Sequence, residues 1–116
     1  MVSTLDQARR FALSLPETAE QPHFEMSSFR VRGKIFATVP PDGAYLHVFV
    51  DEMEIDASVT EDPAAFEPLR WGQRTRGLRI RLASAPERRV NELLEDSWRR
   101  KAPKRVAAEY DLERSQ

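Results

Sequence analysis

Basic and aromatic side chains alternate with apolar ones in two stretches of this 116-residue chain. In the segment 78–82, Arg79 and Arg81 alternate with two leucines and an isoleucine, and the segment 45–50 alternates aromatic residues with aliphatic ones. Successive side chains of a β-strand point to opposite faces, so each segment would present one apolar and one polar or aromatic face. Cations can neutralise phosphates, and aromatic rings can stack on bases. The pattern therefore predicts a surface that contacts nucleic acid.

Ten residues form the candidate nucleic-acid-binding set. They are Arg30, Lys34, Arg70, Arg74, Arg76, Arg79, Arg81, Phe36, Tyr45 and Trp71. In this hypothesis Arg74, Arg76, Arg79 and Arg81 contact phosphates, while Phe36, Tyr45 or Trp71 stacks on bases. The alternative is that the aromatic residues pack under the C-terminal helices, or that they bind a protein partner or a second copy of the chain.

Charge is unevenly distributed along the chain, although the net charge is only −1. Residues 35–69 contain eight acids and no Lys or Arg, whereas residues 70–105 contain twelve Lys or Arg and four acids. The blocks fit either ordinary solvated surface or a molecule with one basic face. The near-neutral total argues against indiscriminate binding to nucleic acid.

The residue types that support catalysis do not form a recognisable motif. His23 and His47 are the only histidines, and Glu25 lies two residues from His23. This spacing could give an acid–base pair or two metal ligands, but it lacks the helical H-E-x-x-H arrangement. Gly72 and Gly77 are too far apart for a phosphate-binding loop. We therefore expect no enzymatic activity, no metal and no cofactor.

The length of the chain fits one domain, which we place at residues 1–110 with a loose tail at 111–116. No cysteine is present, so neither a disulfide framework nor a thiolate metal site is predicted. The N-terminus lacks the apolar core of a signal peptide, and no apolar run approaches the roughly 20 residues that span a bilayer. We expect a cytoplasmic protein without a membrane partner.

The elements that would position these residues run helix, three strands, helix, two strands, helix. The first helix would be capped by Thr4 and end at Pro16, and the last would be capped by Ser84 and run to about Lys101. Residues 17–21 are expected to be a polar connection and 72–77 a loop, with 66–71 as an edge strand because of Pro68. This order predicts a two-layer α+β fold, an antiparallel five-stranded sheet with helices on one face.

The hairpin in residues 27–39 allows two registers around Gly33. A two-residue loop places Val31 opposite Lys34, whereas a three-residue loop places Phe29 opposite Ile35. We favour the second, because it puts Phe29 and Ile35 in the core and leaves Phe36 on the outer face. A shift of one residue would reverse every side chain.

Several strings along the chain resemble the MmcQ/YjbR family of small bacterial proteins. They are residues 15–17 (LPE), 23–24 (HF), 29–37 (FRVRGKIFA), 93–99 (LLEDSWR) and 102–105 (APKR). The resemblance spans roughly residues 5–106 and implies a two-layer α+β domain that binds DNA through a double-wing arrangement of hairpins. Relatives often carry an aromatic residue at the start of the last strand, where this chain has Thr75-Arg76-Gly77-Leu78.

Overall fold

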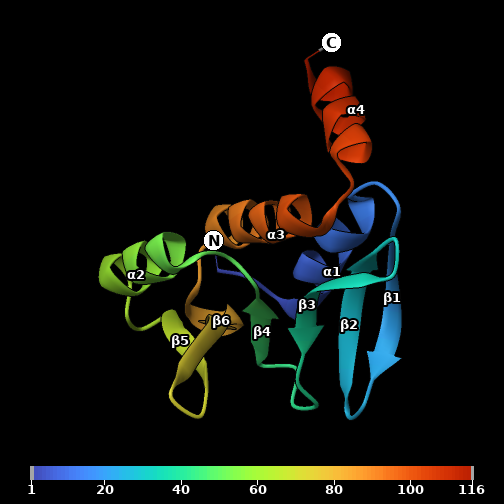
Figure 1. Cartoon of the computed structure of the whole chain (residues 1–116). Coiled ribbons are helices and arrows are strands. Elements are labelled where there is room, and N and C mark those ends of the chain that lie inside the picture. Colours follow the sequence, from blue (N-terminus) through green and yellow to red (C-terminus); the bar gives the residue numbers. More distant parts are fainter. Residues whose placement is uncertain (1, 116) are drawn as a thin grey trace.

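The computed structural model describes residues 2–115, which form four α-helices and one six-stranded sheet (Figure 1). The helices are α1 (Leu5–Ser14), α2 (Glu52–Glu61), α3 (Glu87–Lys101) and α4 (Lys104–Arg114). The strands are β1 (Thr18–His23), β2 (Met26–Val31), β3 (Lys34–Val39), β4 (Tyr45–Val48), β5 (Phe66–Trp71) and β6 (Arg74–Arg81). A short 3-10 turn, Leu82–Ser84, precedes α3.

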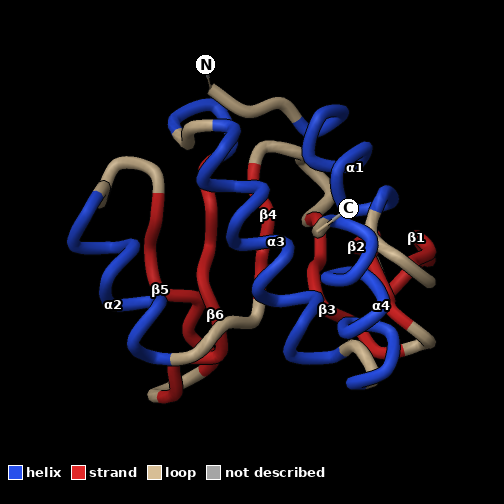
Figure 2. Tube along the Cα trace, turned by 90° about the horizontal axis from the view of Figure 1, so that it is seen from above, coloured by secondary structure: helices blue, strands red, loops and turns tan. Residues whose placement is uncertain are grey.

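The strands are ordered β1-β2-β3-β4-β6-β5, and every neighbouring pair is antiparallel. Figure 2 shows α2 and α3 lying across one face of this sheet. The predicted α+β class with helices on one face is confirmed, and the sheet has six strands where five were predicted. The position of β5 at an edge, inferred from Pro68, is also correct.

Strand β1 was predicted to be a polar connection. Its sequence, TAEQPH, has no apolar alternation, and none of its side chains is fully buried. It is an edge strand held by the backbone ladder to β2 and by Ser28, whose hydroxyl donates to the Gln21 carbonyl at 2.7 Å. An edge strand of this kind gives no hydrophobic signal because it buries so little apolar surface.

The core lies between the sheet and helices α1 to α3. Thr4 caps α1 as predicted, since its side chain accepts a hydrogen bond from the Gln7 amide at 3.2 Å. From α3, the predicted apolar stripe is fully buried, namely Val90, Leu93, Leu94 and Trp98. The alternating residues of β4 and β6, which include Leu46, Val48, Leu78 and Ile80, meet this stripe from the sheet.

Trp98 connects the start of the chain to its end. Its indole nitrogen donates a hydrogen bond to the Pro16 carbonyl oxygen at 3.1 Å, across 82 positions of sequence. The Tyr110 ring of α4 packs edge-on against the indole, with 5.1 Å between ring centroids. Next to Pro16, Glu17 pairs with Arg32 in the β2–β3 turn.

The β2–β3 hairpin adopts the register that we did not favour. Val31 is opposite Lys34, and the two-residue turn has positive φ angles of 50° at Arg32 and 82° at Gly33, as a tight hairpin requires. The register then shifts between Phe29 and Arg30, which pair with Ala37 and Ile35. Phe36 is thus the extra residue of a β-bulge, which explains why the predicted faces of Ile35 and Phe36 are wrong.

The predicted loop at residues 72–77 is also wrong, because β6 begins at Arg74. Only two residues, Gly72 and Gln73, separate the strands, and Gly72 has a φ of +64°. A second register shift lies between Leu69 and Arg70, which leaves Arg76 as the extra residue. This bulge interrupts the alternation, so Leu78 and Ile80 are buried while Arg74 and Arg76 remain exposed.

Two details of the helix ends differ from expectation. Ser84 belongs to the 3-10 turn and does not cap α3, which follows Pro86 without a side-chain cap. Residues 111–114 of the predicted loose tail belong to α4, which is attached to α3 by the Arg99–Asp111 and Arg114–Glu95 ion pairs, and Gln116 lies outside the described residues. None of the helices in residues 2–115 is both long enough and apolar enough to cross a membrane.

Candidate nucleic-acid interface

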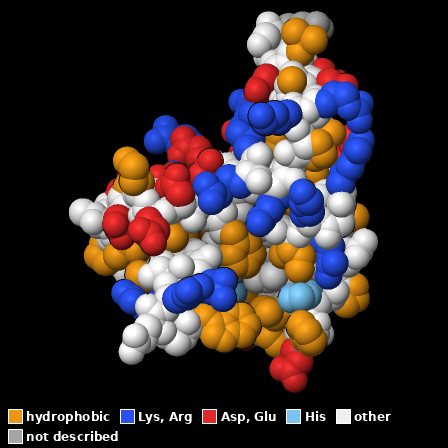
Figure 3. All heavy atoms as spheres, in the orientation of Figure 1, with side chains coloured by type: hydrophobic (Ala, Val, Ile, Leu, Met, Phe, Trp, Pro, Cys, Tyr) orange, Lys and Arg blue, Asp and Glu red, His pale blue; other side chains and the backbone are white. Residues whose placement is uncertain are grey.

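A groove with a volume of about 700 Å³ opens between the β1–β2 and β5–β6 hairpins, beside the C-terminal end of α3 (Figure 3). Apolar side chains such as Ile35, Phe49 and Leu69 form much of its wall. Five of its twelve lining residues are basic or imidazole side chains, namely His23, His47, Arg76, Arg100 and Lys101, and none is an acid. The groove therefore combines apolar walls with a cationic rim, which is suited to an anion that also carries an apolar part.

The groove forms because β3 and β4 separate. Their ladder contains only two residue pairs, Ala37↔Val48 and Thr38↔His47. Beyond these pairs the strands are bridged by Ser97 of α3, which donates to the Phe36 carbonyl at 2.6 Å and accepts from the Phe49 amide at 3.0 Å. The end of α3 thereby approaches the gap, so Arg100 and Lys101 reach the rim.

His47 contributes a buried imidazole to this groove. Only 8% of the residue is exposed, and its Nδ1 atom lies 3.4 Å from the Thr38 hydroxyl. Its Nε2 atom is buried and has no hydrogen-bond partner among the described residues. Burial lowers the pKa of His47, and the positive charge of Arg79 lowers it further, so the ring is neutral near pH 7.

Tyr45, Arg79 and Arg81 form a cluster on the same face of the sheet. The Arg79 guanidinium carbon lies 3.8 Å from the centroid of the Tyr45 ring, and that of Arg81 lies 5.3 Å from it. Arg79 also pairs with Glu67 of β5 at 3.1 Å. The Tyr45 ring is therefore covered by a guanidinium group, and Arg79 is partly neutralised.

The other arginines of the β5–β6 hairpin are free of carboxylates. Among the described residues, no Asp or Glu oxygen lies within 4.0 Å of the charged group of Arg70, Arg74, Arg76 or Arg81. Elsewhere ion pairs are common, and they occupy Arg9, Arg32, Arg89, Arg99, Arg105 and Arg114. Trp71, opposite Arg74 in the register, is 78% exposed beside these cations and lines the groove.

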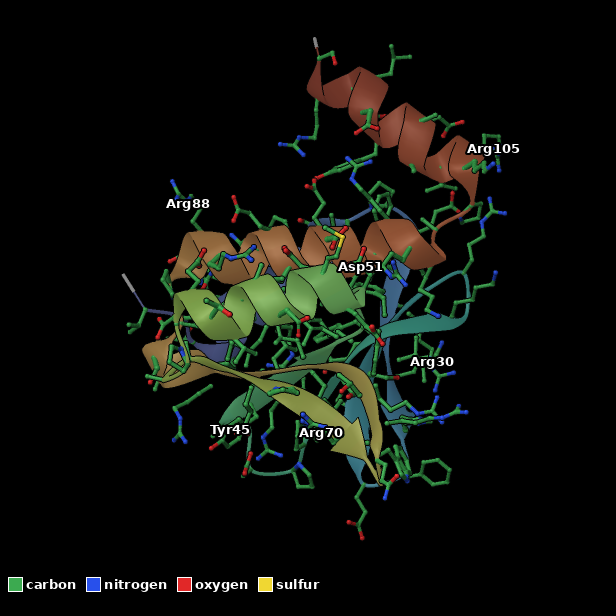
Figure 4. The ribbon with its side chains drawn as sticks, turned by 60° about the vertical axis from the view of Figure 1, so that its left-hand side comes forward. Arg30, Tyr45, Asp51, Arg70, Arg88 and Arg105 are labelled. Carbon is green, nitrogen blue, oxygen red and sulfur yellow. The ribbon has the colours of Figure 1, made fainter. Side chains whose placement is uncertain are left out.

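Not every candidate residue lies near the groove. Phe36 is 0% exposed in the core and packs against Phe29, so it is not available to stack on a base. Arg30 is on the β2–β3 side of the sheet, where it donates to Ser28 and to the Pro22 carbonyl, and exposed Lys34 lies beside the hairpin turn. Figure 4 shows Arg30 well separated from Tyr45.

The possible pairing of His23 with Glu25 is not realised. His23 lines the groove, but Glu25 lies in the β1–β2 turn and lines a different hollow beside α1. Four residues of the groove with basic or imidazole side chains were absent from the candidate set, namely His23, His47, Arg100 and Lys101. The alternation of aromatic and aliphatic residues in 45–50 places His47 on the correct face. Nothing in the sequence places the end of α3 beside the gap between β3 and β4.

Comparison with known proteins identifies the family. The model of the YjbR family matches residues 13–100. The chain belongs to the YjbR family. The match covers the sheet, α2, the last two residues of α1 and all but the last residue of α3, and therefore includes almost the whole groove.

A solved structure shares this YjbR fold. The crystal structure of the Deinococcus radiodurans protein DR2400, described by a DUF419 domain, superposes with a TM-score of 0.72 at 22% sequence identity. The similarity covers 84% of this chain and 77% of that one. At this identity the likeness concerns the fold alone. No curated protein matches the chain.

Proposed function

We propose that this YjbR-family protein binds DNA through the outer face of its sheet. The observation that supports the proposal is the set of cations on and beside β6 that have no carboxylate partner within residues 2–115. Charged side chains without protein partners remain available for phosphates, whose neutralisation releases counterions and drives binding. In this proposal Arg74, Arg76, Arg81 and Lys101 contact the backbone, and Trp71 stacks on a base.

The dimensions of β6 are compatible with a short backbone track. Its eight residues, at about 3.3 Å per residue, span roughly 23 Å between the first and last Cα atoms. Arg74 lies at one end of the strand and Arg81 at the other, with the bulged Arg76 between them. Acids gather over α2, away from this track (Figure 3), and Glu67 of β5, which lies beside it, is paired with Arg79.

Fluorescence anisotropy with a labelled duplex across a salt series tests the proposal. For about four phosphate contacts, log K should fall against log salt with a slope of about −3.6 on duplex DNA. Arg88→Ala is the matched control, because Arg88 is an exposed arginine at the other end of α3 (Figure 4). Failure to bind either duplex or single-stranded DNA at low salt would rule the proposal out.

The second candidate function is association with a protein or with another copy of the chain. It is favoured by two exposed aromatic residues at the hairpin turns, Phe24 at 91% and Trp71 at 78% exposure. Light scattering distinguishes this function, since it predicts a dimer mass that decreases when Phe24 or Trp71 is replaced by Glu. Phe36 is unsuitable for that test because it is in the core.

A further inference from the structure

The groove between β3 and β4 has a floor with an unmet hydrogen-bonding requirement. A buried polar atom without a partner is destabilising unless another group supplies the hydrogen bond. The Nε2 atom of His47 is such an atom, and the residue is more than nine-tenths buried. A ligand that reached the floor would therefore need a polar edge.

The walls of the groove favour a different part of a ligand from the part that its floor favours. Phe49, Leu69 and Ile35 present apolar surface, and the exposed Trp71 ring stands at one side. Flat aromatic rings pack well against such side chains, and this packing depends little on which base supplies the ring. A ligand that fits both walls and floor is a planar ring with hydrogen-bonding edges.

The rim adds a preference for negative charge. Arg76 and Lys101 have no carboxylate partner among the residues 2–115, and Arg100 has only a marginal one in Asp51 at 4.0 Å. Because none of the twelve lining residues is an acid, an anionic group at the rim would meet mainly attractive charges, with Asp51 beside Arg100 as the exception. The three cations come from β6 and from the end of α3, which both line the groove.

We infer that the groove binds one nucleotide unit, with the base between the apolar walls, its edge at His47 Nε2 and its phosphate at Arg76, Arg100 and Lys101. The unit can be a free nucleoside phosphate or one nucleotide of a strand. A base in a duplex is paired and stacked and does not reach such a groove without being extruded. For one nucleotide of a strand, the inference rests on the proposed function. It then implies that the protein prefers single-stranded to duplex DNA.

The two tryptophans give a direct readout for free nucleotide. Trp71 is exposed at the groove, whereas Trp98 is 0% exposed in the core. Titration with thymidine 5′-monophosphate should quench Trp71 fluorescence and shift the NMR signals of the His47 imidazole. Inorganic phosphate should bind at least tenfold more weakly, because it lacks the base. In Trp71→Phe, which retains Trp98, the quenching should disappear.

Two variants test the named contacts. Replacing Arg100 and Lys101 together by Ala should weaken binding of thymidine monophosphate about tenfold, since one exposed and one half-buried cation are lost. His47→Phe keeps an aromatic ring but removes Nε2, and we expect a two- to tenfold loss. Arg88→Ala is the control on the same helix and should bind as the wild type does.

The outcomes separate this inference from DNA binding. Tighter binding of an oligothymidylate than of a duplex, weakened by the Arg100 and Lys101 replacements, supports both. Binding of thymidine monophosphate without binding of either DNA supports the groove and contradicts the proposed function. Equal affinity for duplex and single strand, with no response of Trp71 or His47 to the mononucleotide at millimolar concentration, overturns the groove and leaves the proposed function standing.

Discussion

The Ser97 hydroxyl group donates a hydrogen bond to the Phe36 carbonyl oxygen over 2.6 Å. Phe36 lies just outside the two residue pairs of the β3–β4 ladder, so it is not paired with β4 there. The same hydroxyl accepts a hydrogen bond from the Phe49 amide, and Ser97 is completely buried. One side chain of α3 thus satisfies backbone groups on both sides of the gap from which the groove is built.

Ser97→Ala should therefore destabilise the protein. The substitution leaves a buried carbonyl and a partly buried amide unpaired, and each such group costs about 1–3 kcal/mol. Urea denaturation should show a loss of at least 2 kcal/mol in the free energy of unfolding. Ser14→Ala, at an exposed hydroxyl on the last residue of α1, is the control and should change it by less than about 0.5 kcal/mol. Equal effects of the two substitutions would contradict the bridging role.

Gly77 is predicted to resist even a methyl group. A Cβ atom at this position would lie 2.4 Å from the Val48 carbonyl oxygen and 3.1 Å from the Phe49 ring. The carbonyl belongs to the β4 backbone, so relief requires a shift of β4 against β6 and should cost about 2–3 kcal/mol. Gly72→Ala is the comparison, because its Cβ meets nothing within 4 Å and only its positive φ opposes the change. Thermal unfolding should show the larger loss for Gly77→Ala.

The neutral His47 ring predicts a pH dependence of stability. Its pKa is lowered by burial first and by Arg79 second, while Asp42 and Glu67 act in the opposite direction. Between the lowered value and the ordinary value of 6.5, the unfolded chain binds more protons than the folded one. Stability should therefore decrease as the pH falls below about 6.5, with a contribution of at most about 1.4 kcal/mol per pH unit from one proton.

Urea denaturation at pH 7 and at several values down to pH 5 measures this effect. His47→Gln removes the titrating ring and should flatten the stability profile over that range relative to wild type. Carboxylates whose pKa is lowered by ion pairs, such as Glu20 and Asp111, lose their contributions only at more acidic pH. Parallel profiles for wild type and His47→Gln would show that His47 is not the group responsible.

The arginines of β6 should differ in their effect on DNA binding. Replacing Arg74 or Arg76 by Ala should reduce the salt slope by about 1 each, because each removes one phosphate contact. Arg79→Ala should change the slope much less, since Arg79 is already paired with Glu67 and stacked on Tyr45. Anisotropy titrations at several salt concentrations give these slopes. A larger change for Arg79 than for Arg74 would contradict the assignment of the free arginines.

Elements with a clear hydrophobic period could be predicted from the sequence. The faces of β4 and β6 were placed correctly because Leu46, Val48, Leu78 and Ile80 alternate without interruption. Helix α3 was placed correctly because its four apolar positions follow the helical repeat. The order of these elements, together with the strings shared with the YjbR family, was sufficient for the fold class.

The errors come from two bulges and an edge. Phe36 and Arg76 each add one residue to a strand, and a single added residue exchanges the two faces from that point onward. Strand β1 was missed because an edge strand with little buried surface has no apolar alternation. The rim of the groove required knowledge of tertiary contacts, since Arg100 and Lys101 are distant in sequence from β3 and β4.

The contacts of Ser97 and Trp98 also determine when the chain can fold. Both residues hold segments from the first half of the protein, and the Trp98–Pro16 hydrogen bond spans 82 positions. During synthesis on the ribosome, the first four strands emerge before the helix that completes their hydrophobic layer. An unfinished sheet with an uncovered apolar face is prone to aggregate. The nascent chain is thus vulnerable until its last quarter has been translated, and chaperones that shield apolar surface would act in that interval.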